Sequence, residues 1–118
     1  MTRHIELGKK GEDLAADWLT RNGYQVLQRN WRHGRYEVDI IAGRKNIIHF
    51  VEVKCRQSNA YGQPEESVNR KKIEHILQGA AGWLHNHPGH SRVQYDVLAI
   101  TLRKNAEPEY FMIEDVYL

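Results

Sequence analysis

Apolar residues recur at helical spacing in two separate segments of the chain. Residues 5–22 form the first, with apolar positions at Leu7, Leu14, Ala15, Trp18 and Leu19. Their spacing is close to the 3.6-residue period of an α-helix, and Asn22-Gly23 is a typical helix stop. A second helix is expected to open at Pro64, because Pro and the acids that follow it suit a helix start. Ala80-Ala81-Gly82 would make this second helix thin enough for close packing on a sheet.

Five further segments have the composition of β-strands, with β-branched and aromatic residues bounded by turn-forming ones. These segments are residues 24–31, 37–42, 47–54, 92–102 and 110–113. Gly43-Arg44-Lys45-Asn46 has the composition of a hairpin connection between the second and third strands. The order is therefore α-β-β-β-α-β-β, which predicts an α/β fold with a mixed central sheet flanked by helices.

Charged residues interrupt the third predicted strand only at its end. Residues 47–53 are apolar on both faces for most of their length, which is typical of a covered central strand. Side chains alternate along a strand, so Glu52 and Lys54 point to the same face, about 7 Å apart at their Cα atoms. Buried charges of this kind are costly unless they are paired or bind an ion.

A third charged residue, Asp39, is brought to the same region by the hairpin. Strict alternation would place Glu37, Asp39 and Ile41 on one face of the second strand, and Val38 and Ile40 on the other. Pairing around the turn sets Asp39 opposite residues 49–51, to within about one or two residues. The sequence thus predicts that two carboxylates and a lysine converge, with the backbone carbonyl of Val53 as a further oxygen.

Two interpretations of Asp39, Glu52 and Lys54 remain open from spacing alone. The first is a cross-strand ion pair of Lys54 with either carboxylate. The second is a site for Mg²⁺ or Mn²⁺, since both ions prefer oxygen ligands. Such an ion can polarise a phosphoryl oxygen and activate water in phosphodiester hydrolysis, while Lys54 would orient the water or stabilise the developing charge.

Composition bounds the class of protein. A chain of 118 residues is one ordinary domain, and no apolar run approaches the length of a membrane span. The N-terminal residues lack the apolar stretch of a signal peptide, and Cys55 is the single cysteine, so we expect a cytoplasmic protein. Residues 29–72 hold ten Lys and Arg against five Asp and Glu. This basic stretch suits nucleic acid, with an ordinary solvated surface as the alternative.

An ordered series of short motifs resembles the YraN-like family of small bacterial proteins. The matching segments are Gly11–Ala16, Gly23-Tyr24, Arg29–Arg32, Glu37–Ile41, Phe50–Arg56, Pro64–Val68 and Lys71-Lys72. That family resembles the Holliday-junction-resolvase-like branch of the restriction-endonuclease-like, PD-(D/E)xK superfold. The resemblance implies a single nuclease-like domain over residues 1–118.

The resemblance also implies residue roles. Asp39 and Glu52 become metal ligands and Lys54 the catalytic lysine. Glu12, which by its position alone is a surface helix residue, matches a first-helix glutamate that completes the metal site in resolvase-like relatives. Glu37 matches a glutamate two before the aspartate and is expected to support a ligand. Tyr36 departs from the pattern, because the family usually has Gly there, and this bears on the local turn.

Basic and aromatic residues flank these positions in the sequence. The candidates for binding the phosphate backbone are Arg29, Arg32, Arg35, Arg56, Lys71 and Lys72. Trp31, Tyr36 and Tyr61 are candidates for stacking on bases, with a place at the edge of the core as the alternative. Asp96, on the fourth predicted strand, would either pair with Arg92 or lie near the site.

Two functions follow from these residues. The first is an Mg²⁺- or Mn²⁺-dependent nuclease acting on DNA, with branched DNA among its candidate substrates. The second is a non-catalytic nucleic-acid-binding or adaptor protein on the same scaffold. Convergence of Glu12, Asp39 and Glu52 would favour the first. A homodimer would suit the binding of a DNA junction.

Overall fold

The computed structural model describes residues 2–57, 70–89 and 92–116, and the side chains of residues 8–57 and 71–89 and of 92–116 within them. Its elements are α1 (Thr2–Arg21), β1 (Gln25–His33), β2 (Tyr36–Arg44), β3 (Ile47–Gln57), α2 (Arg70–Asn86), β4 (Val93–Leu102) and β5 (Glu109–Ile113). The predicted order of elements and the α/β class are confirmed. The predicted start of the second helix at Pro64 lies outside the described residues.

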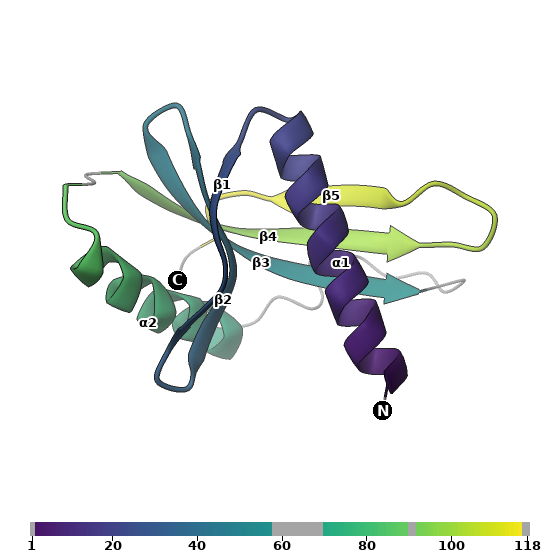
Figure 1. The fold of residues 1–118 in the computed structure, drawn as a ribbon, viewed down its shortest axis with the longest axis horizontal. Helices are drawn as coiled ribbons and strands as arrows, with labels where there is room; N and C mark the ends of the chain where they lie inside the picture. The colour runs from purple at the N-terminus through teal and green to yellow at the C-terminus, as the bar shows by residue number, and fades with distance from the viewer. Residues whose placement is uncertain (1, 58–69, 90–91, 117–118) are drawn as a thin grey trace.

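The five strands form one mixed sheet in the order β1-β2-β3-β4-β5 (Figure 1). Neighbouring strands are antiparallel except β3 and β4, which are parallel and are separated in the chain by α2. A parallel pair needs such a crossover, whereas the β2–β3 pair needs only the hairpin at Arg44–Ile47. Strand β3 is therefore the centre of the sheet.

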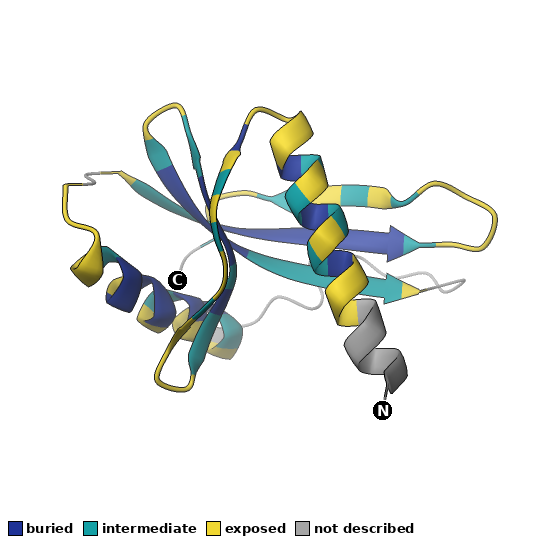
Figure 2. Ribbon diagram, in the orientation of Figure 1, coloured by how far each residue is buried: buried dark blue, intermediate teal, exposed yellow. Residues whose placement is uncertain are grey.

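The two helices cover opposite faces of the sheet. Ala15 and Leu19 of α1 are fully buried against a cluster that includes Ile40, Val51 and Leu98. On the other face Ile76, Ala80 and Trp83 of α2 are buried with Val38, Ile41 and Phe50. Figure 2 shows the central strands as the most buried part of the sheet. Neither described helix is long and apolar enough to cross a membrane.

Glycines in both helices allow a close approach to the strands. A Cβ built on Gly11 of α1 would lie 2.4 Å from the Cβ of Cys55 on β3. A Cβ on Gly82 of α2 would lie 2.3 Å from the ring of His33, at the end of β1. The close packing of the second helix on the sheet, predicted from residues 80–82, is confirmed at Gly82. At Gly11 the same absence of a side chain brings the middle of α1 onto the end of β3.

Strict alternation along β2 is not observed, and this corrects the predicted faces. Ile40 packs in the α1-side cluster, whereas both Val38 and Ile41 pack in the α2-side cluster. The paired strand β1 has a left-handed residue at the same level, Asn30 with φ 54°. Such a residue breaks the regular pleat. The end of the β1–β2 hairpin lies against α2 (Figure 1). Asp39 sits at the level of Asn30, between the paired positions Ile40 and Val38.

Candidate functional site

Asp39 occupies the point where strands β2 and β3 stop pairing. The described register ends at Ile40 opposite Val51. The next free donor on β3, the backbone N–H of Val53, donates a 2.8 Å hydrogen bond to Oδ2 of Asp39. The side chain thus takes the place of a ladder hydrogen bond. Asp39 therefore lies beside residues 52 and 53, slightly beyond the 49–51 that the hairpin alone predicted.

The environment of Asp39 disfavours its charge. Burial is the largest cause and raises the pKa of this carboxyl to about 7, against the opposing effect of the hydrogen bond from Val53. The nearby carboxylates of Glu52, Glu37 and Glu12 raise the pKa further by repulsion. Four acids from α1, β2 and β3 thus act on one another here. A perturbed carboxyl among like charges is typical of a functional site.

Glu52 and Lys54 share one face of β3, as predicted. Their side chains are 20% and 32% exposed, and Nζ of Lys54 lies 3.8 Å from Oε2 of Glu52. The ion pair that spacing left open is therefore present for Glu52, along one strand. Lys72 of α2 lies next to Lys54, and its interaction with Lys54, burial and charge repulsion by Lys54 lower the pKa of Lys72. Lys72, which the sequence predicted only as a phosphate contact, therefore lies beside Lys54, the predicted catalytic lysine.

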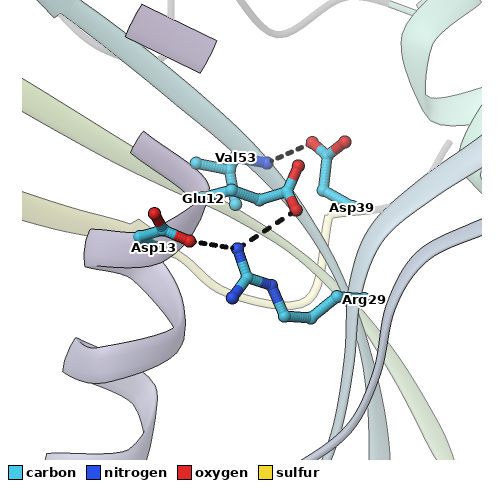
Figure 3. A network of polar contacts seen from close by, with 5 residues as sticks. All are labelled: Glu12, Asp13, Arg29, Asp39 and Val53. Atoms are coloured by element: carbon cyan, nitrogen blue, oxygen red, sulfur yellow. Dashed lines mark hydrogen bonds and ion pairs between the residues drawn. The ribbon is translucent and has the colours of Figure 1, made fainter. Parts of the chain in front are cut away.

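Glu12 reaches the site from α1, one residue after the close contact at Gly11. Its Oε1 lies 3.4 Å from Nη2 of Arg29, and the same nitrogen lies 2.6 Å from Oδ1 of Asp13. Figure 3 shows the Glu12 carboxylate directed from α1 toward Arg29 and Asp39. The surface position that spacing suggested for Glu12 is corrected, because its side chain is only 16% exposed.

Glu37 is close enough to raise the pKa of Asp39, and its own carboxylate pairs with Arg32 at 3.5 Å. It lies at the rim of the carboxylate group on β2 and makes no described contact with Glu52. Its predicted supporting role stays a prediction. Tyr36, which stands one residue earlier, contacts the ring of His75 on α2 edge-on. Tyr36, the residue that departs from the pattern of the resembled family, therefore packs the β1–β2 hairpin against α2.

The donor atoms suit a hard divalent ion. Asp39, Glu52, Glu12 and the carbonyl of Val53 offer only oxygen, which Mg²⁺ and Mn²⁺ prefer. The negative charge around Asp39 is also what a cation would relieve. Within the described ranges, however, no three His, Cys, Asp or Glu side chains are grouped closely enough to hold an ion. Glu12 is engaged by Arg29, and Glu52 by Lys54.

The other predicted nucleic-acid contacts are spread over the β1–β2 hairpin, β3 and α2. Arg32 and Arg35 are exposed near the tip of the β1–β2 hairpin, and Arg35 donates a hydrogen bond to the hydroxyl of Tyr36. Arg56 is partly exposed at the end of β3, and Lys71 is exposed on α2. No described contact tests their role.

Trp31 is not placed to stack on a base. Its Nε1 donates a 2.9 Å hydrogen bond to the carbonyl of Gly79, and its ring packs against the α2-side cluster. The indole therefore belongs to the edge of the core, where a buried Trp finds a partner for its N–H. Tyr61, the third aromatic candidate, lies outside the described residues.

A second polar cluster, which the sequence did not reveal, surrounds Asp96. Oδ2 of Asp96 lies 2.8 Å from Nδ1 of His49, and both side chains are almost fully buried. Oδ1 of Asp96 accepts hydrogen bonds from Gln94 and from the backbone N–H of Asp115. The sequence predicted that Asp96 pairs with Arg92 or lies near the carboxylate site, but its described contacts are with His49, Gln94 and Asp115. The only sequence signal was a polar residue, His49, within an otherwise apolar strand.

Comparison with known sequences and structures gives consistent matches. The sequence model of the family described as "Uncharacterised protein family UPF0102" matches residues 11–100. A UPF0102 protein of Chloroherpeton thalassium is 39% identical, covering 99% of this chain and 97% of that protein. A UPF0102 protein of Rhodococcus opacus is 40% identical, covering 99% of this chain and all of that protein. Among solved structures, the Holliday junction resolvase Hjc of Archaeoglobus fulgidus aligns with a TM-score of 0.48 and 18% identity, over 87% of this chain and 74% of that chain.

Proposed function

This chain belongs to the UPF0102 family, and we propose that it is a nuclease of the PD-(D/E)xK type that hydrolyses phosphodiester bonds in DNA with Mg²⁺ or Mn²⁺. The observation that carries the proposal is Asp39. It is a partly buried carboxyl with a pKa of about 7, repelled by three other carboxylates at the point where two strands separate. A protein gains no stability from this arrangement. Binding a cation there would remove the repulsion and favour the charged form.

The residues that would hold the ion are Asp39 and Glu52, with Glu12 and the carbonyl of Val53 completing the set. When bound, a divalent ion supplies charge that polarises the phosphoryl oxygen and makes the attacking water more acidic. Asp39 is already oriented by the hydrogen bond from Val53. Because the fixed backbone holds it, only the side chains of Glu12 and Glu52 have to move.

Lys54 and Lys72 would hold the scissile phosphate. They approach from β3 and α2, on the side of Glu52 that faces α2. Two ammonium groups this close repel each other, and an anion between them would relieve the repulsion. In the transition state Lys54 would stabilise the growing negative charge on the phosphate or orient the water. Lys72 would then place the phosphate against Lys54.

A cleavage screen tests the proposed function. Wild-type protein with Mn²⁺ or Mg²⁺ is incubated with linear, branched and single-stranded DNA, and with RNA. Branched DNA is included because of the resemblance to resolvase-like proteins. We expect metal-dependent cleavage of DNA that is lost in Asp39→Ala and Glu52→Ala, both of which should keep the wild-type circular dichroism spectrum. No metal-dependent product on any substrate would overturn the proposal.

The adaptor function remains a second candidate, because one observation favours it. Glu12 and Glu52 each have a cationic partner, and the described side chains form no ready three-ligand group. An adaptor would bind DNA with an affinity whose logarithm falls linearly with the logarithm of the salt concentration, and it would take up no Mn²⁺. Titration calorimetry with Mn²⁺ separates the two, since only the nuclease requires uptake that Asp39→Ala abolishes.

A further inference from the structure

Arg29 of β1 is the cation that pairs with Glu12. One nitrogen of its guanidinium, Nη2, contacts both Asp13 and Glu12 (Figure 3). The contact with Asp13 is short, at 2.6 Å, and the contact with Glu12 is longer, at 3.4 Å. Asp13 therefore anchors Arg29 to α1. Glu12 is held by the weaker of the two contacts, and this contact can break while the arginine stays near its place.

The guanidinium also keeps donors for another ligand. Both contacts use Nη2, while Nε and Nη1 make no hydrogen bond within the part of the chain that the structure describes. The side chain is 36% exposed, so Nε and Nη1 are accessible from solvent. Nη2 belongs to both donor edges of the guanidinium plane, so a phosphate that replaces Glu12 at Nη2 would also reach the neighbouring Nε or Nη1 and bind in a bidentate manner.

We propose that Arg29 exchanges Glu12 for a phosphate of the bound DNA, so that DNA binding releases Glu12 to join the ligands of the divalent ion. The proposal rests on the proposed function of the site. A phosphate competes with Glu12 for Arg29, and a divalent ion competes with Arg29 for Glu12. Each ligand therefore removes the competitor of the other, and the two bind cooperatively. Arg29 is a positioning residue in this scheme, and the site becomes complete only on its substrate.

Titration calorimetry with Mn²⁺ tests the exchange, with and without a short DNA duplex whose phosphorothioate linkages resist hydrolysis. In the wild type we expect the duplex to strengthen Mn²⁺ binding by about tenfold, a typical coupling between two sites. In Arg29→Gln we expect tighter Mn²⁺ binding than in the wild type without DNA. The enhancement by DNA should fall toward onefold, because Glu12 is then already free.

Arg21→Gln is the control. Arg21 also pairs with an acid, Asp17, at 3.0 Å, but no described contact joins it to Glu12 and it is not among the proposed contacts to DNA. Its loss removes the same charge and should leave the coupling by DNA as in the wild type. Circular dichroism and thermal denaturation of both variants establish that they are folded.

The remaining outcomes separate the two proposals. If Arg29→Gln binds Mn²⁺ no better than Arg21→Gln does, and keeps the full enhancement by DNA, the exchange is wrong while the metal site stands. If neither the wild type nor Arg29→Gln takes up Mn²⁺ with or without DNA, the proposed metal site and the exchange both fall. If Mn²⁺ binds and DNA does not strengthen it in the wild type, only the exchange falls.

Discussion

Asp96, which is buried, and Asp39, which is partly buried, are two carboxylates of the same sheet, and their surroundings differ in kind. Asp96 contacts the imidazole of His49 and accepts two further hydrogen bonds. Asp39 accepts one hydrogen bond, from Val53, and is repelled by three other carboxylates. A satisfied buried group contributes to a specific fold, whereas an unsatisfied one costs stability and persists where function requires it. The comparison separates a structural cluster from a functional one.

The largest expected effect is on activity at Asp39. Asp39→Asn keeps an oxygen that accepts the hydrogen bond from Val53 but removes the charge. We expect metal-dependent cleavage to fall by about a thousandfold or more, because a neutral amide is a poor ligand and leaves charge in the transition state uncompensated. Initial rates on the best DNA substrate measure this. A variant with cleavage near the wild-type rate would show that Asp39 is not at the reacting centre.

Asp96→Ala should have the opposite profile. It leaves His49, Gln94 and the N–H of Asp115 without their acceptor, and His49 is almost fully buried. Breaking a buried polar cluster of this kind costs about 3–5 kcal/mol, which denaturant unfolding will detect. Below its melting temperature the variant should retain Mn²⁺ affinity. A loss of Mn²⁺ binding in the folded variant would erase the distinction between the two clusters.

The pH dependence of stability gives an intermediate effect. Burial and repulsion raise the pKa of Asp39 to about 7 in the folded state. Between about pH 4 and pH 7 the unfolded chain therefore releases a proton that the folded protein retains. Stability should fall as pH rises through this window, by at most about 4 kcal/mol, and should be constant above it with respect to this group.

Asp39→Asn isolates this contribution. The difference in unfolding free energy between variant and wild type should be near zero at pH 4 and should favour the variant at pH 7. Urea unfolding at several pH values, without divalent ions, measures both proteins. A constant difference across the window would mean that Asp39 is no more strained than an ordinary carboxyl. Asp39 would then belong to a structural cluster, as Asp96 does.

The smallest expected effect concerns how α1 delivers Glu12. Gly11→Ala would place a Cβ 2.4 Å from the Cβ of Cys55 and push the helix away from β3. We expect a loss of about 1–3 kcal/mol in stability, as for other overpacked contacts, and weaker Mn²⁺ binding. Thermal unfolding and titration calorimetry measure the two quantities.

Two further variants make this test specific. Cys55→Gly removes the opposing Cβ, so the double variant should recover part of both losses, which a double-mutant cycle would detect. Gly8→Ala has open space around its new Cβ. It should stabilise the protein by about 0.5–1 kcal/mol, because alanine favours a helix. Equal effects at Gly8 and Gly11 would mean that the close approach at Cys55 has no role.

Much of the fold could be predicted from the sequence, because the signals for helices and strands are local. The period of Leu14, Ala15, Trp18 and Leu19 marked α1, and the apolar run before Glu52 marked a central strand, as the structure confirms. The alternation predicted for β2 was wrong. It assumed a regular pleat along β2. The left-handed backbone at Asn30 interrupts the pleat, and β2–β3 pairing ends at Ile40. Val38 and Ile41 therefore lie on one side of the sheet. Local periodicity carries no signal for such a break.

By itself the sequence determined which residues carry charge in apolar strands, and hence that Asp39, Glu52 and Lys54 would lie near one another. Only the tertiary structure decided their relations, because these depend on contacts between segments far apart in the chain. It placed Glu12 beside Asp39, paired Glu12 with Arg29, and set Lys72 next to Lys54. It also paired Asp96 with His49. Burial and the approach of other charges decide whether a carboxylate is satisfied or strained, and both are properties of the folded chain.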